Sequence, residues 1–235
     1  METVNGILLE LEKMGTPTIK KVLMNHGARE PFFGVRVGDM KTIVKRVKKD
    51  YALSLALYET GNSDAMYLAG LIADEEAMTE QDLDYWAEQA YWHMLSEYSV
   101  AWVAAESKFG YKLGKKWIDD EKEQIAVCGW STLGGLLALG RSAHFAEGEL
   151  AMLIDRVVKT LHKSKNRVRY AMNSFLIAVG TYEPTLRAKA IAAGNALGEI
   201  QVDMGGTACK VPEAPSYIEK AAAKWNGKFK KTVRC

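Results

Sequence analysis

Apolar residues recur three and four positions apart along most of this chain, and no long stretch alternates between apolar and polar residues as a half-buried strand would. Pro17, Pro184 and Pro215 each precede a periodic segment, and proline is favoured in the first turn of a helix. Gly140 and Gly180 each follow such a segment, as glycines that end helices do. The pattern predicts an all-α protein.

The predicted helices show a weak internal repeat. A shift of about forty residues places residues 128–140 over 168–180, so that Trp130 falls on Tyr170 and Gly140 on Gly180. About forty residues is the length of a two-helix HEAT or armadillo unit, and such units stack with their second helices along a concave surface. We expect a HEAT-like or armadillo-type α-α superhelix (solenoid), with a plain helical bundle as the alternative.

The organisation of the chain follows from the one long interruption of this pattern. Residues 199–216, "EIQVDMGGTACKVPEAPS", read as an irregular loop. We therefore expect a repeat array over residues 1–198, this loop, and a C-terminal helix with a basic tail over residues 217–235 that packs on the array.

Charge changes the picture, because the net charge of +2 hides a strong segregation. Residues 1–50 carry ten Lys and Arg against six acids, residues 51–107 carry none against eleven, and residues 108–235 carry 21 against twelve. Clustered cations favour a polyanionic partner. The alternative is that the acids and bases of different segments meet in space as ordinary surface ion pairs.

Other classes of protein are disfavoured by composition. The three cysteines form no close pair, which argues against a disulfide framework or a zinc ribbon. No apolar run is long enough to cross a membrane, and the N-terminal segment lacks a secretory signal, so we expect a cytoplasmic protein. His93 and Glu97, one turn apart, lack a second ligand pair for a metal, and no motif for a metal or other cofactor is present.

The segment "HKSKNRVRYAMNSF" (162–175) places several cations at the predicted start of a helix, where the macrodipole repels positive charge. Free backbone N–H groups at that position bind anions, and Asn166 could be the N-cap residue. An anion, phosphate above all, is the expected partner. Alternatively, the lysines belong to a solvated loop and Tyr170 to the core. The candidate anion-binding residues here are Lys163, Lys165, Asn166, Arg167, Arg169, Tyr170 and Asn173.

Two segments resemble a known family. "PFFGVRVGDMKTIVKRV" (31–47) and "NRVRYAMNSFLIAVG" (166–180) are similar to segments of the AlkD-like DNA glycosylases, which are HEAT-like repeat proteins that recognise alkylated DNA. The resemblance extends over most of residues 20–180, and the C-terminal segment is similar to a branch of the superfamily linked to alkylation repair. It implies a solenoid whose concave, cationic channel holds duplex DNA by its backbone. Arg36, Lys41 and Lys45 are then further candidate DNA-binding residues.

The catalytic pattern of that family is incomplete in this chain. The family's enzymes use a Trp followed four residues later by an Asp, whose carboxylate stabilises the cationic sugar. Trp92 is the nearest match, but Ser96 stands four residues on, and Glu97 would lie one step too far round an α-helix. Trp102 and Glu106 restore an aromatic and an acid one turn apart at a shifted position. The catalytic candidates are therefore Trp92, Trp102 and Glu106, although aromatic residues at helical spacing are commonly core residues.

These observations together predict a DNA-binding protein of the alkylation repair type, which holds double-stranded DNA by its phosphates and needs no cofactor. Excision of alkylated purines stays open, because a phosphate contact survives the loss of a carboxylate more readily than catalysis does. The alternatives are a non-catalytic reader of damaged or bent DNA and a helical-repeat scaffold for an acidic protein segment. The acidic segment 51–107 has no explanation in the DNA hypothesis.

Overall fold

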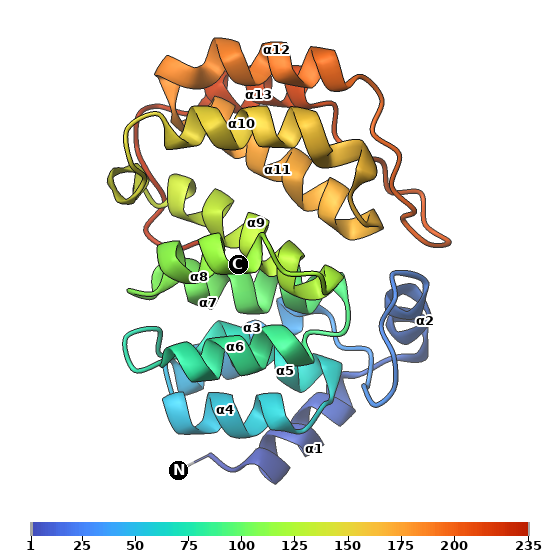
Figure 1. Ribbon diagram of the computed structural model, residues 1–235. Helices are drawn as coiled ribbons and strands as arrows, with labels where there is room; N and C mark the ends of the chain where they lie inside the picture. The colour runs from blue at the N-terminus through green and yellow to red at the C-terminus, as the bar shows by residue number, and fades with distance from the viewer. Residues whose placement is uncertain (1, 235) are drawn as a thin grey trace.

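In the computed structural model, residues 2–234 are described, and their secondary structure consists of helices joined by loops, with no strand in this range (Figure 1). The all-α prediction is confirmed. The α-helices are α1 (Val4–Met14), α2 (Pro17–Asn25), α3 (Val37–Val47), α4 (Tyr51–Glu59), α5 (Ser63–Ile72), α6 (Glu80–Gln89), α7 (Ala101–Glu106), α8 (Gly110–Trp117), α9 (Glu123–Ala138), α10 (Glu149–Thr160), α11 (Asn166–Tyr182), α12 (Arg187–Leu197) and α13 (Ala214–Lys224). The remaining elements are the π-helix η1 (Met94–Val100) and three single 3-10 turns, η2 (Ser142–His144), η3 (Leu161–Lys163) and η4 (Pro184–Leu186).

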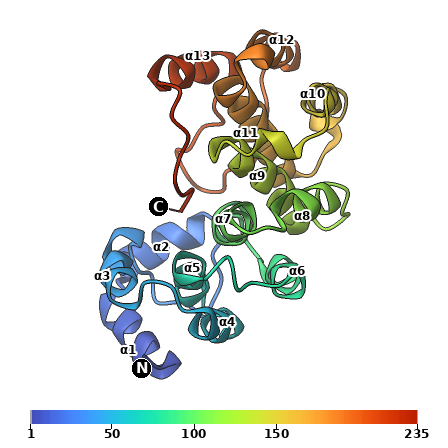
Figure 2. The ribbon, with the colours of Figure 1, turned by 90° about the vertical axis from the view of Figure 1, so that its left-hand side faces the viewer.

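The helices form two layers (Figures 1 and 2). An outer layer holds α4, α6, α8, α10 and α12. An inner layer holds α3, α5, η1 with α7, α9, α11 and α13, and each of these inner helices packs against the next inner helix. Because each outer helix is followed in the chain by its inner partner, the unit is a helical hairpin. Helices α9 and α11, which contain the two segments related by the forty-residue shift, are successive inner helices. The segment 162–175, expected at the start of a helix, leads into α11, the second helix of its hairpin.

Large side chains pack between successive helices of the same layer. Tyr58 and Trp86 stack with ring centroids 4.2 Å apart, and Trp130 meets Phe175 at 5.1 Å. Small residues let the inner helices approach closely: a Cβ added to Gly70 on α5 would lie 2.7 Å from that of Ser99 on η1. Such close packing at native density holds the inner helices at fixed spacing.

The acidic segment 51–107 is explained in large part by ion pairs between repeats. Lysines of α8 and of the start of α9 reach the acids of α6, with Lys112 paired to Glu80, Lys116 to Asp84 and Lys122 to Glu88 at N–O distances of 2.7, 2.7 and 2.6 Å. Exposed pairs of this kind contribute about 0–1 kcal/mol each. Their main consequence is that these lysines are not free to bind an external anion.

The C-terminal region contains a loop, a helix and a tail. Helix α13 begins at Ala214, inside the segment expected to be loop, because Pro215 fits the first turn of a helix. The residues that precede it, 199–213, form the irregular loop, which lies beside α2 at the right of Figure 1. Among the described residues, no helix is long and apolar enough to cross a membrane.

Candidate functional site

The first turn of α11 meets carboxylates from two neighbouring inner helices. The backbone N–H of Arg167 donates to Oε1 of Glu123 at 2.6 Å. The guanidinium of Arg167 donates through Nε at 3.0 Å, and also through Nη2, to one carboxylate oxygen of Glu97 on η1. The Glu97 and Arg167 side chains are only 6% and 16% exposed. The anion predicted at this cationic helix start is therefore supplied, at least in part, by the protein itself.

The position of Glu97 depends on an irregularity that the sequence did not reveal. Residues Met94–Val100 form a π-helix, whose i→i+5 bonds widen the turn and change the direction of the side chains relative to an α-helix. Glu97 would lie too far round the helix only if the spacing were α-helical throughout. In the π-helix its carboxylate points to α11.

Burial dominates the electrostatics of this pair and its surroundings. Desolvation raises the pKa of Glu97 to about 7, although the adjacent Arg167 acts in the opposite direction. Burial, followed by the charge of Arg167 and then by His26, lowers the pKa of His93 to about 3. The rings of His93 and His26 lie 6.1 Å apart. At neutral pH, His93 is neutral and Glu97 is near its titration midpoint.

The polar residues that follow on α11 hold the loop 199–213. Asn166 is not an N-cap residue, because the helix starts one residue earlier than such a role requires and Lys165 stands at the cap position. Its side-chain amide instead donates to the carbonyl of Asp203 at 2.9 Å and accepts from the Asp203 N–H at 2.7 Å. Asn173 donates to the carbonyl of Pro212 at 2.8 Å. The two asparagines therefore fix both limbs of the loop.

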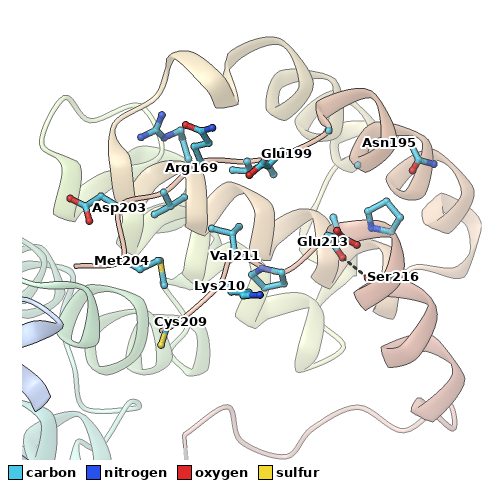
Figure 3. A pocket seen from close by; sticks show the side chains of 18 of the residues that line it. Arg169, Asn195, Glu199, Asp203, Met204, Cys209, Lys210, Val211, Glu213 and Ser216 are labelled. Atoms are coloured by element: carbon cyan, nitrogen blue, oxygen red, sulfur yellow. Dashed lines mark hydrogen bonds between the residues drawn. The ribbon is translucent and has the colours of Figure 1, made fainter. Parts of the chain in front are cut away.

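Arg169 lies between those asparagines and faces a pocket of about 1240 Å³ (Figure 3). It donates to Oδ1 of Asn166 at 3.2 Å. The pocket lies among α11, α12, α13 and the loop, and both signs of charge line it, including Lys210 and Glu199. A mixed lining of this kind does not favour a strongly anionic ligand.

The remaining candidates on this segment differ in their contacts. The Arg167 guanidinium lies 4.6 Å from the ring centroid of Tyr170, and its Nη1 is 3.3 Å from Sδ of Met204 in the loop. Lys165 donates to the carbonyl of Glu121. Lys163 is exposed, and within the described residues its side chain makes no ion pair or hydrogen bond. Of the α11 cluster, Lys163 is the cation most open to an external anion.

The three catalytic candidates are each engaged in separate contacts. Trp92 is buried and donates through Nε1 to Oγ of Ser63 at 2.9 Å. Trp102 is half-buried, with its ring 5.1 Å from that of Tyr98. The carboxylate of Glu106 accepts from the backbone N–H of Val233 at 2.8 Å, and it also contacts two other residues of the C-terminal tail, Thr232 and Arg234. In this arrangement Glu106 anchors the tail.

Helix α3 presents the clearest set of unpaired cations. Arg36, Lys41 and Lys45 are exposed, and within residues 2–234 their side chains make no ion pair or hydrogen bond. Lys48, which the sequence interpretation missed, shares this condition. Lys41 and Lys45, four residues apart, share one face of α3, and Lys48 is the C-cap residue that follows the helix.

The loop before α3 is fixed by Asp64 of the acidic segment. Its buried carboxylate accepts from the backbone N–H groups of Phe33, Gly34 and Val35 at 2.6, 2.9 and 3.2 Å. Burial raises the pKa of Asp64 above its ordinary value, although these hydrogen bonds oppose the rise. The "FGV" segment is thereby tied to α5, which holds the start of α3 in place.

No group of three or more His, Cys, Asp or Glu side chains in residues 2–234 is arranged to hold a metal ion. His93 lies beside Trp92, with ring centroids 5.2 Å apart, and Glu97 is occupied by Arg167.

Comparisons with known proteins agree with this architecture. The family model described as "DNA alkylation repair enzyme" matches residues 7–218. An uncharacterized protein of Listeria innocua is 33% identical over 233 residues, which cover 96% of this chain and 100% of the relative. An uncharacterized protein of Listeria monocytogenes is 32% identical over 94% of this chain and 98% of the relative.

A solved structure is also similar over 100% of both chains, with a TM-score of 0.90 and 36% sequence identity. It is described as belonging to a new family of proteins related to the HEAT-like repeat DNA glycosylases, with affinity for branched DNA structures. The prediction of a HEAT-like helical fold is confirmed by this likeness.

Proposed function

Since the chain belongs to the DNA alkylation repair enzyme family, we propose that it binds DNA by its phosphates through the exposed cations that begin on α3. The observation that carries this proposal is that Arg36, Lys41 and Lys45 are exposed and unpaired. A free cation that contacts a phosphate releases condensed counterions, which drives binding. A cation already in an ion pair has to give up its partner first.

The residues of α11 take a different part in this proposal. Arg167 is committed to Glu97, while Asn166 and Asn173 hold the loop 199–213. We assign these residues, with Lys165, Arg169 and Tyr170, to the support of the last repeats rather than to phosphate contacts. Lys163 is the member of that segment that we retain as a DNA contact.

We extend the affinity for branched DNA from the solved relative to this chain. Contacts to phosphates position a protein on DNA without reading base sequence, so a surface of unpaired cations suits recognition by shape. The structure supports a reader more than an enzyme, because Trp92 is buried and the carboxylate of Glu106 is engaged by the tail. We propose that the DNA lies in the concave channel that the family resemblance implies.

Excision of alkylated purines is the second candidate function, and Glu97 favours it. A carboxyl group whose pKa lies near 7, on a π-helix, has the character of an acid or base at a functional site. Release of a methylated purine from methylated DNA by the wild-type protein, and its loss in Glu97→Gln, would establish this function. Tight binding of DNA without release of a purine would favour the non-catalytic reader of damaged or bent DNA.

The test of the binding proposal is a titration of labelled duplex and four-way junction DNA by fluorescence anisotropy at several salt concentrations. The variant Arg36→Glu, Lys41→Glu, Lys45→Glu is expected to weaken binding by about tenfold or more and to lower the log–log salt slope by about 3, because three phosphate contacts are lost.

The matched control reverses three charges on the outer helices, with Lys112→Glu, Lys159→Glu and Lys189→Glu. Equal losses in both variants would show that only net charge matters and would overturn the assignment to α3. If the folded wild-type protein binds neither DNA, the scaffold for an acidic protein segment becomes the better interpretation.

A further inference from the structure

The C-terminal tail, residues 225–234, is a strap that crosses the inner layer from α13 back to α5 (Figures 1 and 2). At its start, Trp225 and Phe229 pack against Tyr182 at the end of α11, with ring centroids 5.9 and 6.4 Å from that ring. The backbone N–H of Lys230 then donates to the carbonyl of Ala138, the last residue of α9, at 2.9 Å. The strap is therefore fixed along its first half.

The far end of the strap is fixed more firmly. Val233 is buried and packs in a small cluster with Ala105 and Ala138. Arg234 donates to the carbonyl of Ala73, at the end of α5, at 2.6 Å, and to Glu75 at 2.8 Å. The strap thus follows the C-terminal ends of α11, α9, α7 and α5 in turn.

Between these anchors, the strap exposes three lysines, Lys228, Lys230 and Lys231. In the described part of the chain, their ammonium groups make no ion pair or hydrogen bond. Since helix C-termini attract cations, these lysines could simply serve the macrodipoles of the inner helices. Other groups already fill that role.

The carbonyl groups at these helix ends have other donors. Arg187 donates to Gly180 at the end of α11, and Arg141 donates to the carbonyls of residues 105–107 at the end of α7. The ends of α9 and α5 are bound by the backbone of Lys230 and by Arg234. The three ammonium groups are not required for capping, so their charge is available to an external anion.

The strap also continues the basic face of α3. Glu75 accepts from both Lys49, at 2.5 Å, and Arg234, at 2.8 Å, so the residue after Lys48 and the end of the strap meet at one carboxylate. Unpaired cations therefore lie at Lys41 and Lys45 on α3 and at Lys48 directly after it, and resume at Lys231 and Lys228 on the strap. An array that extends along several repeats fits a long, regularly charged polymer better than a single phosphate group.

We propose that Lys228, Lys230 and Lys231 contact the phosphodiester backbone of DNA and extend the α3 surface along the C-terminal edge of the inner layer. This inference rests on the proposed function, since it names a second part of the same binding surface. Because the strap backbone is already fixed, binding orders only the three side chains, which limits its entropic cost.

The experiment uses the full chain with Lys228→Gln, Lys230→Gln and Lys231→Gln, which removes the charges and keeps the anchors Phe229, Val233 and Arg234. Titration of labelled duplex and junction DNA is expected to show a log–log salt slope lower by about 3 and an affinity lower by about tenfold. The control for total charge is Lys112→Gln, Lys159→Gln and Lys189→Gln on the outer helices, of which Lys112 and Lys189 are paired with Glu80 and Asp155. Thermal unfolding should be the same for the strap variant and the wild type.

Distinct outcomes separate the two proposals. If the wild type binds DNA and the α3 variant does not, while the strap variant binds as the control does, the strap inference is overturned and the proposed function stands. If the wild type does not bind DNA, the proposed function fails, and the strap inference fails with it. Strap-dependent binding to phosphatidylserine vesicles or polyglutamate without binding to DNA would also overturn the assignment.

Discussion

The two edges of the inner layer use charge in opposite ways. Around the loop before α3 and the start of α11, carboxylates find partners inside the protein: Asp64 accepts from that loop, and Glu97 and Glu123 accept from Arg167, although Arg36 and Lys163 at the same edge stay unpaired. At the C-terminal ends, arginines and backbone groups satisfy the carbonyls, and the lysines of the strap stay unpaired. The difference teaches that a cation's pairing, more than its place in the sequence, decides whether it can bind an external anion.

The largest expected effect concerns the paired edge. Above pH 7, where Glu97 is charged, Arg167→Met should lower the free energy of unfolding by about 3–5 kcal/mol, because the buried carboxylate then loses its counter-charge or has to take up a proton. Lys230→Met on the strap should change it by no more than about 0.5 kcal/mol, since the lysine is exposed. Urea unfolding followed by circular dichroism measures both. Similar small changes in the two variants would mean that the edges do not differ in the way described.

The second prediction uses pH to isolate Glu97. Its pKa in the folded protein, about 7, lies above the ordinary value of 4.5, so the folded state binds the proton more tightly. The contribution of this group to stability is therefore fully present below about pH 4.5 and is lost as pH rises to 7, by about 3 kcal/mol. His93, with its lowered pKa, acts in the opposite direction, because unfolding lets it take up a proton in acid.

Glu97→Gln removes the first of these effects and keeps the second. The stability of the variant relative to the wild type should rise between pH 5 and pH 8 by an amount approaching that figure. Thermal or urea unfolding at matched pH values gives the difference directly. A difference that does not vary with pH would show that Glu97 does not titrate in this range.

A smaller effect is expected where α11 holds the loop 199–213. Asn166→Ala removes two hydrogen bonds to Asp203 and should cost about 1–2 kcal/mol. Hydrogen exchange should become faster in the loop and stay unchanged in the strap, because the two segments are anchored separately. Faster exchange in both segments would indicate that they open together.

The sequence predicted the parts of this structure that depend on local pattern. Helical periodicity and the forty-residue shift gave the stacked hairpins, and the matched segments lie on successive inner helices, α9 and α11. It could not predict the partner of Arg167, since Glu97 lies seventy residues away and its direction is set by a π-helix. The free N–H groups at the start of α11 suggested an external anion. Their partner is the carboxylate of Glu123, which only the packing of α9 against α11 brings there.

The same limit applies to the roles of individual polar residues. Asn166 has the chemistry of an N-cap residue, and only the path of the loop 199–213 shows that it binds Asp203 instead. Lys112, Lys116 and Lys122 look like free cations until the acids of α6 are placed beside them. By contrast, Lys41 and Lys45 could be predicted to share a basic face of α3, because their spacing is local.

The smallest expected effect tests the comparison most directly. If the cation of Arg167 is neutralised by Glu97, Arg167→Met should leave the salt slope of DNA binding close to that of the wild type, whereas the α3 triple variant lowers it by about 3. The measurement is made at a low temperature at which circular dichroism shows the variant to be folded. A slope lower by about 1 would mean that Arg167 leaves Glu97 for a phosphate when DNA binds. In that case the first turn of α11 would join the binding surface, and Glu97 would be a competitor that DNA must displace.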